Sequence, residues 1–116
     1  MTSLYYNPAC SKCRTAAGLL ADAGVEAELV RYLDTPPTVA ELRALMAMLG
    51  IDEPRAMMRT GEAVYAELGL DRADAEVLLE AIAAHPILLE RPIFVVGGRA
   101  VIARPPERVR ELIPSA

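Results

Sequence analysis

Cys10 and Cys13 are the residues of this sequence whose type and spacing most directly indicate chemistry. A C-x-x-C pair is typical of redox chemistry in a reducing compartment, where structural disulfides are rare. Cys10 follows a strand-like run and the turn residues Asn7-Pro8, and a helical pattern begins directly after it. The N–H groups and partial positive charge of a helix N-terminus stabilise a thiolate and lower its pKa. The sequence therefore predicts a reactive thiolate at Cys10.

Cys13 lies about one helical turn further along, within disulfide range of Cys10. One interpretation makes it a resolving thiol that closes a Cys10–Cys13 disulfide; another makes it a spectator while Cys10 works alone. A zinc site would need four ligands, and only His85 remains besides acidic residues. We therefore expect no metal. The remaining alternative for Cys10 is a buried structural cysteine.

Three arginines stand at the expected ends of structural elements, although the chain is acidic overall. Arg59 falls in a loop-like segment, Arg91 precedes a proline and a strand, and Arg104 follows a strand. Taken singly, each is typical of a solvated surface arginine. The planar guanidinium pairs bidentately with oxyanion oxygens, so together they would form an anion cradle. Lys12 and Arg14 add positive charge beside the first cysteine.

Apolar periodicity, capping residues and turn residues predict the elements that would position these side chains. Thr38-Val-Ala-Glu41 is a capping box that opens a helix closed by Gly50. Gly97-Gly98 lies between two β-branched runs, which favours a type I′ hairpin turn. The predicted strands are 3–6, 27–32, 93–96 and 99–102, and the predicted helical segments are 11–23, 38–50, 54–58, 62–68, 74–84 and 105–113.

This element order predicts an α/β protein with the thioredoxin-like fold. The first two strands need a parallel crossover and the last two form a hairpin, so one mixed four-stranded sheet satisfies both. A helical insertion at about 38–84 would separate a parallel β-α-β half from an antiparallel β-β-α half. We expect residues 1–116 to form a single domain, since this is near the commonest domain size.

The charge and hydropathy of the chain exclude several classes of function. A formal net charge of −4 argues against a general nucleic-acid binder, which needs a basic surface. No charge-free window reaches the roughly 18–20 apolar residues that span a bilayer, so we expect no membrane association. The first basic residue is Lys12, so a signal peptide is not expected. The sequence predicts a cytoplasmic protein.

Four blocks of the sequence resemble the glutaredoxin-coupled arsenate reductases, the ArsC family. They occur in the family's order and cover nearly the whole chain, from Leu4 to about Ile113. The blocks are Tyr6–Cys10, a middle block with Arg55–Arg59 and Tyr65–Leu70, then His85–Ile93 and Ala103–Glu107.

The resemblance implies a thioredoxin-like fold and specific roles for the residues above. The family's cysteine that matches Cys10 is the nucleophile that bonds to arsenic. The family's arginines that match Arg59, Arg91 and Arg104 bind the oxyanion and the product. The proline that matches Pro92 is cis in the family. We also expect supporting roles around the thiol and the arginines for Asn7, Ser11, Lys12, Arg14 and Pro92.

The combination of a thiolate with arginines makes chemical sense for arsenate, which is an anion at neutral pH. Two like charges about 4 Å apart repel by roughly 4 kcal/mol at an effective dielectric near 20, so cations must offset the approach. In the cycle that the resemblance implies, Cys10 attacks arsenate and a second thiol reduces the arsenic. Glutathione would be the co-substrate, with glutaredoxin or thioredoxin as reductant. No bound cofactor is expected, because sulfur carries the electrons.

Two departures from the family pattern leave alternatives open. The best-known members carry a His where this chain has Tyr6, and they do not generally carry a Cys at position 13. The C-x-x-C pair also resembles the Spx-type transcription regulators, a sister branch that uses it as a redox switch and binds RNA polymerase. Arg104 in Arg-Pro-Pro-Glu favours the reductase branch. A general thiol–disulfide oxidoreductase without an arsenate role is the third interpretation.

Overall fold

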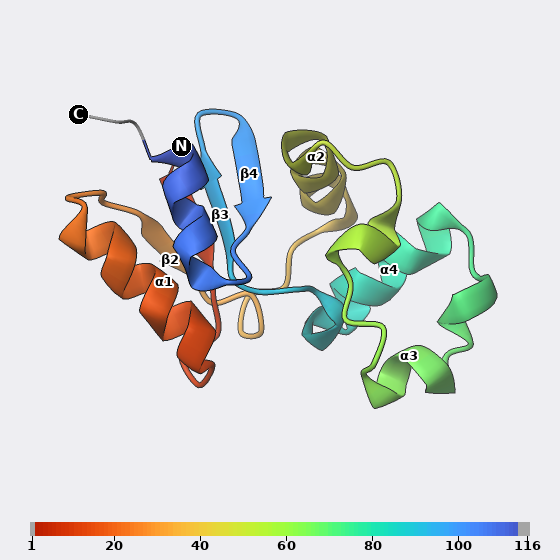
Figure 1. Ribbon diagram of the computed structural model, residues 1–116. Helices are drawn as coiled ribbons and strands as arrows, with labels where there is room; N and C mark the ends of the chain where they lie inside the picture. Colours follow the sequence, from red (N-terminus) through yellow and green to blue (C-terminus); the bar gives the residue numbers. More distant parts are fainter. Residues whose placement is uncertain (1, 114–116) are drawn as a thin grey trace. The chain divides into compact units, whose positions relative to one another are not determined.

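The computed structural model describes residues 2–113 and divides into two compact units (Figure 1). We name residues 2–32 and 91–113 the sheet unit, and Leu33–Glu90 the helical unit. The sheet unit contains β1 (Thr2–Tyr5), α1 (Ser11–Asp22), β2 (Glu28–Val30), β3 (Ile93–Val96), β4 (Arg99–Ile102) and the 3-10 helix η4 (Pro106–Leu112). The helical unit contains α2 (Val39–Leu49), η1 (Pro54–Met57), α3 (Ala63–Glu67), η2 (Leu70–Arg72), α4 (Ala75–Ala84) and η3 (Pro86–Leu88).

The sheet has the mixed topology that the sequence predicts. Its strand order is β2-β1-β3-β4. Strands β1 and β2 pair in parallel, with Leu4 opposite Leu29, whereas β1–β3 and β3–β4 are antiparallel. The parallel pair is connected through α1, as a parallel crossover requires. The predicted α/β fold with a parallel and an antiparallel half is therefore confirmed.

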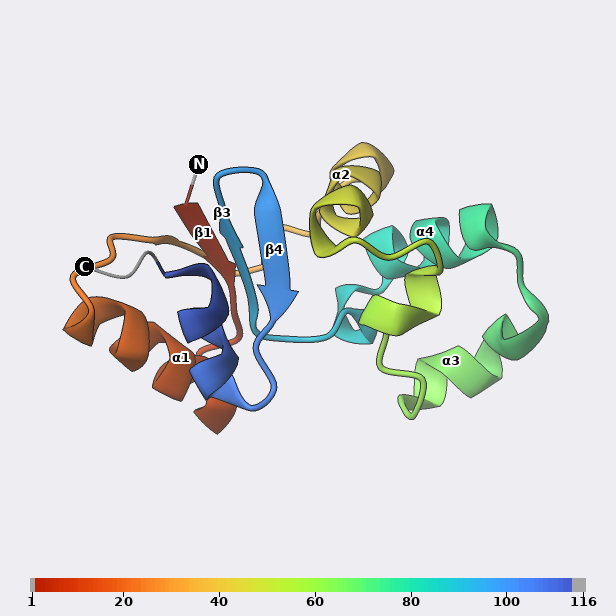
Figure 2. The same cartoon turned by 45° about the horizontal axis from the view of Figure 1, so that its top comes forward.

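One apolar core lies between the sheet, α1 and η4, which lie side by side in Figures 1 and 2. Ala16 and Leu20 are on the inner side of α1, where the 3.6-residue period places them together with the sheet residue Leu4. The remaining buried members are Phe94, Val101, Ala103 and Val109. This packing holds the first turn of α1, and hence Cys10, at a fixed place beside the sheet.

The hairpin between β3 and β4 forms as predicted. Gly97 and Gly98 both have positive φ (56° and 80°), as a type I′ turn requires. The last predicted helix differs from expectation, because Pro106–Leu112 forms a 3-10 helix and not an α-helix. This segment packs on both α1 and β4.

Local capping signals locate the helices of the helical unit. The capping box at Thr38 is complete, since its hydroxyl accepts from the Glu41 N–H (3.1 Å) and the Glu41 carboxylate accepts from the Thr38 N–H (3.0 Å). Gly50 ends α2 in the left-handed conformation, with φ of 71°. Asp74 caps α4 by accepting from the Val77 N–H at 3.0 Å. The boundaries of α2 and α4 match those expected from the sequence. That residues 1–116 form a single domain stays a prediction.

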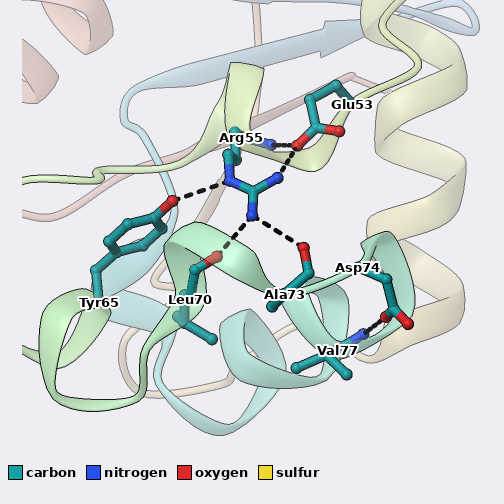
Figure 3. Close-up of polar contacts among 7 residues, drawn as sticks. All are labelled: Glu53, Arg55, Tyr65, Leu70, Ala73, Asp74 and Val77. Atoms are coloured by element: carbon teal, nitrogen blue, oxygen red, sulfur yellow. Dashed lines mark hydrogen bonds and ion pairs between the residues drawn. The ribbon is translucent and has the colours of Figure 1, made fainter.

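Arg55 ties the parts of the helical unit together (Figure 3). Its Nε donates to the Tyr65 hydroxyl (2.9 Å) and its Nη1 to a carboxylate oxygen of Glu53 (2.7 Å). Its Nη2 donates to the carbonyl oxygens of Leu70 (2.6 Å) and Ala73 (2.9 Å). Three nitrogens of one planar guanidinium thus hold η1, α3 and the loop before α4, so Arg55 has a structural role.

Among the described residues, no helix has both the length and the apolar character needed to cross a membrane.

Candidate active site

The segment before α1 is a tight turn that delivers Cys10 to the start of the helix. The Cys10 N–H donates to the carbonyl oxygen of Asn7 (2.9 Å), which closes a four-residue turn with Pro8 at its second position. The Asn7 side chain adds a second bond, since its Oδ1 accepts from the Ala9 N–H at 3.0 Å. Asn7, predicted as a supporting residue, therefore fixes the turn that carries the cysteine.

Cys10 is the N-cap of α1, with extended backbone angles of −91° and 122°. Partial burial favours the neutral thiol, but it is outweighed by the N–H and thiol of Cys13, the N–H of Lys12 and the charge of Arg91. Together they lower the pKa of Cys10 from 9.0 to about 7. Cys10 is only partly buried. A substantial thiolate fraction at neutral pH and access to reactants are what a nucleophile needs.

Cys13 lies one turn inside α1 and is fully buried, with 0% of its surface exposed. Burial raises the pKa of its thiol to about 11, and its proximity to Cys10 adds to the rise, although the Asn7 N–H opposes it. Both cysteines are free thiols. Cys13 therefore stays protonated at neutral pH, whereas a substantial fraction of Cys10 is ionised.

Arg91 and Arg104 come together in the sheet unit although thirteen residues separate them. The Arg104 Nη1 donates to the carbonyl oxygen of Arg91 at 3.0 Å. The Arg91–Pro92 peptide bond is cis, which confirms the prediction, and the Arg104–Pro105 bond is also cis, which the sequence did not predict. The charge of Arg91 contributes to the lowered pKa of Cys10, and an anion site formed by Arg91 and Arg104 stays a prediction.

The other predicted residues beside Cys10 make their contacts with, or through, the main chain. The Arg14 guanidinium donates to the carbonyl oxygen of Pro8 (2.8 Å), so it braces the turn. Lys12 is exposed and stabilises the Cys10 thiolate through its backbone N–H. Ser11, also exposed, begins α1 and accepts at its carbonyl oxygen from the Thr15 hydroxyl (3.0 Å). Whether these residues support catalysis stays a prediction.

Arg59 belongs to the helical unit, where two carboxylates accompany it. Its Nη2 lies 3.2 Å from a carboxylate oxygen of Glu62, and its Nε lies 3.9 Å from one of Glu90. The sequence analysis overlooked both glutamates, although the i, i+3 spacing of Arg59 and Glu62 was a signal for the first. The role of Arg59 in an anion site stays a prediction.

A hollow of about 470 Å³ lies between α1 and β2 in the sheet unit. Its lining is mainly apolar and consists of Ala17, Leu20, Ala21, Val25, Glu26, Ala27, Glu28 and Leu29. No residue predicted to carry chemistry contributes to this lining, so we assign it no part in the reaction.

The lowered pKa predicts how Cys10 reacts with an alkylating reagent. In the Cys13→Ser variant, the rate of alkylation by iodoacetamide should rise with pH with a midpoint near 7, because only the thiolate reacts. Mass spectrometry of quenched samples measures the rate. The Cys10→Ser variant is the matched control, and its buried Cys13 should label little over the same range. A midpoint at or above about 8.5, an ordinary thiol value, would contradict the assignment of Cys10 as nucleophile.

Comparison with known proteins places these residues in a family context. The model of the ArsC family matches residues 5–112, which includes both cysteines and all three arginines. The chain is 46% identical over 112 residues to a protein named arsenate reductase from Neisseria meningitidis, covering 95% of this chain and 96% of that protein. It is 39% identical over 116 residues to a protein named arsenate reductase from Escherichia coli, and the match covers 98% of this chain and 82% of that protein.

Solved structures agree with the sequence comparison. A structure described as arsenate reductase from Vibrio cholerae superimposes with a TM-score of 0.94 at 44% identity, covering 97% of each chain. The match therefore extends over the whole described fold, including the segments that carry Cys10, Arg91 and Arg104.

Proposed function

Because this chain belongs to the ArsC family, we propose that it reduces arsenate to arsenite with electrons supplied by thiols. The observation that carries the proposal is the Cys10 thiol at the N-terminus of α1, with its pKa lowered to about 7 and with Arg91 acting on it. The names of the relatives, arsenate reductases at 39–46% identity, support an oxidoreductase with arsenate as substrate.

The first step forms a bond between sulfur and arsenic. The Cys10 thiolate attacks the As(V) centre and displaces hydroxide, which leaves as water after taking up a proton. The guanidinium of Arg91 and that of Arg104, held on the Arg91 main chain, offset the repulsion between thiolate and oxyanion. We propose Arg59 as a third ligand of the oxyanion. Arginines suit this task because they stay charged and pair with two oxygens at once.

The second step transfers two electrons to arsenic. A second thiolate attacks the Cys10 sulfur, a disulfide forms, and the electron pair of the S–As bond stays on arsenic, which leaves as arsenite. Glutathione would supply this thiol, with glutaredoxin opening the mixed disulfide. Cys13 is the internal alternative, since it is one helical turn away, and the resulting Cys10–Cys13 disulfide would be opened by glutaredoxin or thioredoxin. No bound cofactor takes part in this scheme.

The assay that tests the proposal is arsenite formation from arsenate by the purified protein. We expect turnover with glutathione and glutaredoxin. A separate reaction with thioredoxin tests whether a dithiol protein can also act as the reductant. Reduction of protein disulfides without any arsenite would instead indicate a general thiol–disulfide oxidoreductase. Binding to the RNA polymerase α-subunit without turnover would indicate an Spx-type regulator, an alternative that the arsenate reductase names of the relatives do not favour. A cytoplasmic location stays a prediction.

A further inference from the structure

Helix α1 carries its charged residues at the ends that its dipole disfavours. Lys12 and Arg14 are among its first four residues, Asp22 is its last residue, and its first turn contains no acidic residue. Helices α2 and α4 follow the usual rule, with Glu41 and Glu76 in their first turns. Because the N-terminus of a helix is positive, the charges of α1 lower its stability. A local rule broken in this way is typical of a functional site.

The Arg14 guanidinium is held against the turn that carries the nucleophile. Its Nη1 donates to the carbonyl oxygen of Pro8 (2.8 Å), and the Arg14 N–H donates to that of Cys10 (3.1 Å). Pro8 and Cys10 belong to the same four-residue turn, so the backbone and the side chain together fix the position of the cation. A guanidinium has five N–H donors, and among residues 2–113 no carboxylate pairs with that of Arg14. Its other donors are therefore available to a ligand.

A molecule that approaches Cys10 can reach this cation. Cys10 is partly exposed, and Ser11, Lys12 and Arg14 are all exposed. These residues are neighbours in one turn and one helix of the sheet unit, so their arrangement does not depend on the helical unit. The surface beside the nucleophile thus combines access with two positive charges.

The second step of the proposed reaction needs a cation for the molecule that attacks Cys10. A thiolate forms a bond to the Cys10 sulfur while the S–As bond breaks. Displacement at sulfur proceeds in line, so the attacking molecule approaches from the side opposite arsenic. Cations other than the proposed oxyanion ligands Arg91 and Arg104 must therefore receive it. Glutathione carries two carboxylates and one ammonium, and a guanidinium pairs with a carboxylate through two hydrogen bonds.

We propose that Arg14, assisted by Lys12, binds a carboxylate of the glutathione that reacts at Cys10. This inference rests on the proposed function, since it takes glutathione as the second thiol. It assigns the cations of α1 to the reductant, whereas the arginines of the β3 and β4 region serve the oxyanion. The test uses the tripeptide alone, so that contacts with a protein reductant do not contribute to the result.

The experiment follows thiol–disulfide exchange in the Cys13→Ser background, where no second thiol opens the product. The Cys10 thiolate attacks one sulfur of oxidised glutathione, a mixed disulfide forms, and glutathione leaves as its thiolate. Hydroxyethyl disulfide reacts in the same way but carries no charge, so it is the reference. Mass spectrometry measures the two rate constants. Their ratio is insensitive to the pKa of Cys10, because the same thiolate attacks both reagents.

Arg14→Gln should lower the rate constant with oxidised glutathione by about fivefold, the upper range for an exposed ion pair. The rate constant with hydroxyethyl disulfide should stay the same. Arg14→Lys should recover part of the loss because it keeps the charge, and Lys12→Gln should show a smaller loss than Arg14→Gln. Without either substitution, raising the salt concentration from about 0.05 M to about 0.5 M should lower the ratio, since salt screens exposed charges.

Arg99→Gln is the matched control, because it removes the same charge from an exposed arginine at the other end of the sheet. Arg99 pairs with Val96, which pairs with Thr2 at the start of β1, whereas Cys10 follows the end of β1. This variant should leave both rate constants unchanged.

The inference is overturned if the ratio is the same in Arg14→Gln and Arg99→Gln. It is also overturned if both rate constants fall together in Arg14→Gln, because Arg14 would then only support the turn at Pro8. A ratio that salt leaves unchanged contradicts it as well, and this result requires no substitution at Arg14.

Turnover assays distinguish this inference from the proposed function. Arg14→Gln should raise KM for glutathione and leave KM for arsenate unchanged, and the reverse pattern would assign Arg14 to the oxyanion. Arsenite formation with an unchanged exchange ratio refutes only the binding of glutathione at Arg14. A lowered ratio in a protein that forms no arsenite refutes only the arsenate chemistry.

Discussion

Replacing Cys10 with Ser is expected to abolish arsenate reduction, whichever thiol reductant is supplied. A serine hydroxyl is not ionised at neutral pH, and its oxygen cannot accept the attack of a second thiol as the Cys10 sulfur does. The position of Cys10 at the start of α1, partly accessible and with a pKa of about 7, makes it the thiolate that reacts first. Arsenite formation measures the effect, and far-UV circular dichroism shows that the variant is folded.

The matched control for this prediction is Cys13→Ser, which changes the same atom one turn further along the helix. Cys13 is fully buried and its pKa is raised to about 11, so it should not begin the reaction. This variant should retain turnover with glutathione and glutaredoxin, and should lose any turnover that thioredoxin drives in the wild type. If Cys13 proves essential for adduct formation and Cys10 dispensable, the assignment of the two roles is wrong.

Arg104→Ala is expected to lower kcat/KM for arsenate by roughly tenfold to a hundredfold, because one hydrogen bond to a charged group contributes about 1.5–3 kcal/mol. The substitution removes a guanidinium that we propose as a ligand of the oxyanion. It also removes the bond to the Arg91 carbonyl oxygen, which precedes the cis Pro92. Both losses weaken oxyanion binding, so most of the effect should appear as a higher KM. Steady-state kinetics over a range of arsenate concentrations measures it.

Two further variants define what Arg104 contributes. Arg99→Ala removes an exposed arginine of the same unit, at the start of β4, and should leave the kinetics unchanged. Arg104→Lys keeps the charge but loses the planar guanidinium that pairs with two oxygens. Its kcat/KM for arsenate should therefore lie between those of the wild type and Arg104→Ala. An unchanged kcat/KM in Arg104→Ala with native circular dichroism would show that arsenate is bound elsewhere.

Much of the fold was predictable because its signals are local. The capping box at Thr38, the left-handed Gly50 and the Gly97-Gly98 turn each specify backbone geometry within a few residues, and all three are present. The mixed sheet follows from the order of strands and helices, since a parallel crossover and a hairpin leave few arrangements. The 3-10 winding of η4 was not predictable, because a proline at the start of a helix is compatible with an α-helix or a 3-10 helix.

The candidate site also has a part that the sequence predicted and a part that it did not. The reactivity of Cys10 was predictable, because a helix N-terminus acts on its own N-cap residue whatever the rest of the fold. The source of the positive charge that acts on Cys10 was not predictable. Lys12 and Arg14 are close to Cys10 in sequence, yet Arg14 donates to the Pro8 carbonyl oxygen. The charge that lowers the Cys10 pKa comes from Arg91.

The sequence by itself determined which residues can do chemistry: a cysteine placed to be a thiolate, a second thiol one turn away, and arginines at the ends of elements. These are properties of residue type and of spacing along a helix or strand. Tertiary structure alone decided their partners. It places the Arg104 guanidinium on the Arg91 carbonyl oxygen, and it brings Glu90 close to Arg59 through a backbone bridge. The physical reason is that Coulomb and hydrogen-bond energies depend on distance in space, and only folding determines that distance for residues far apart in the chain.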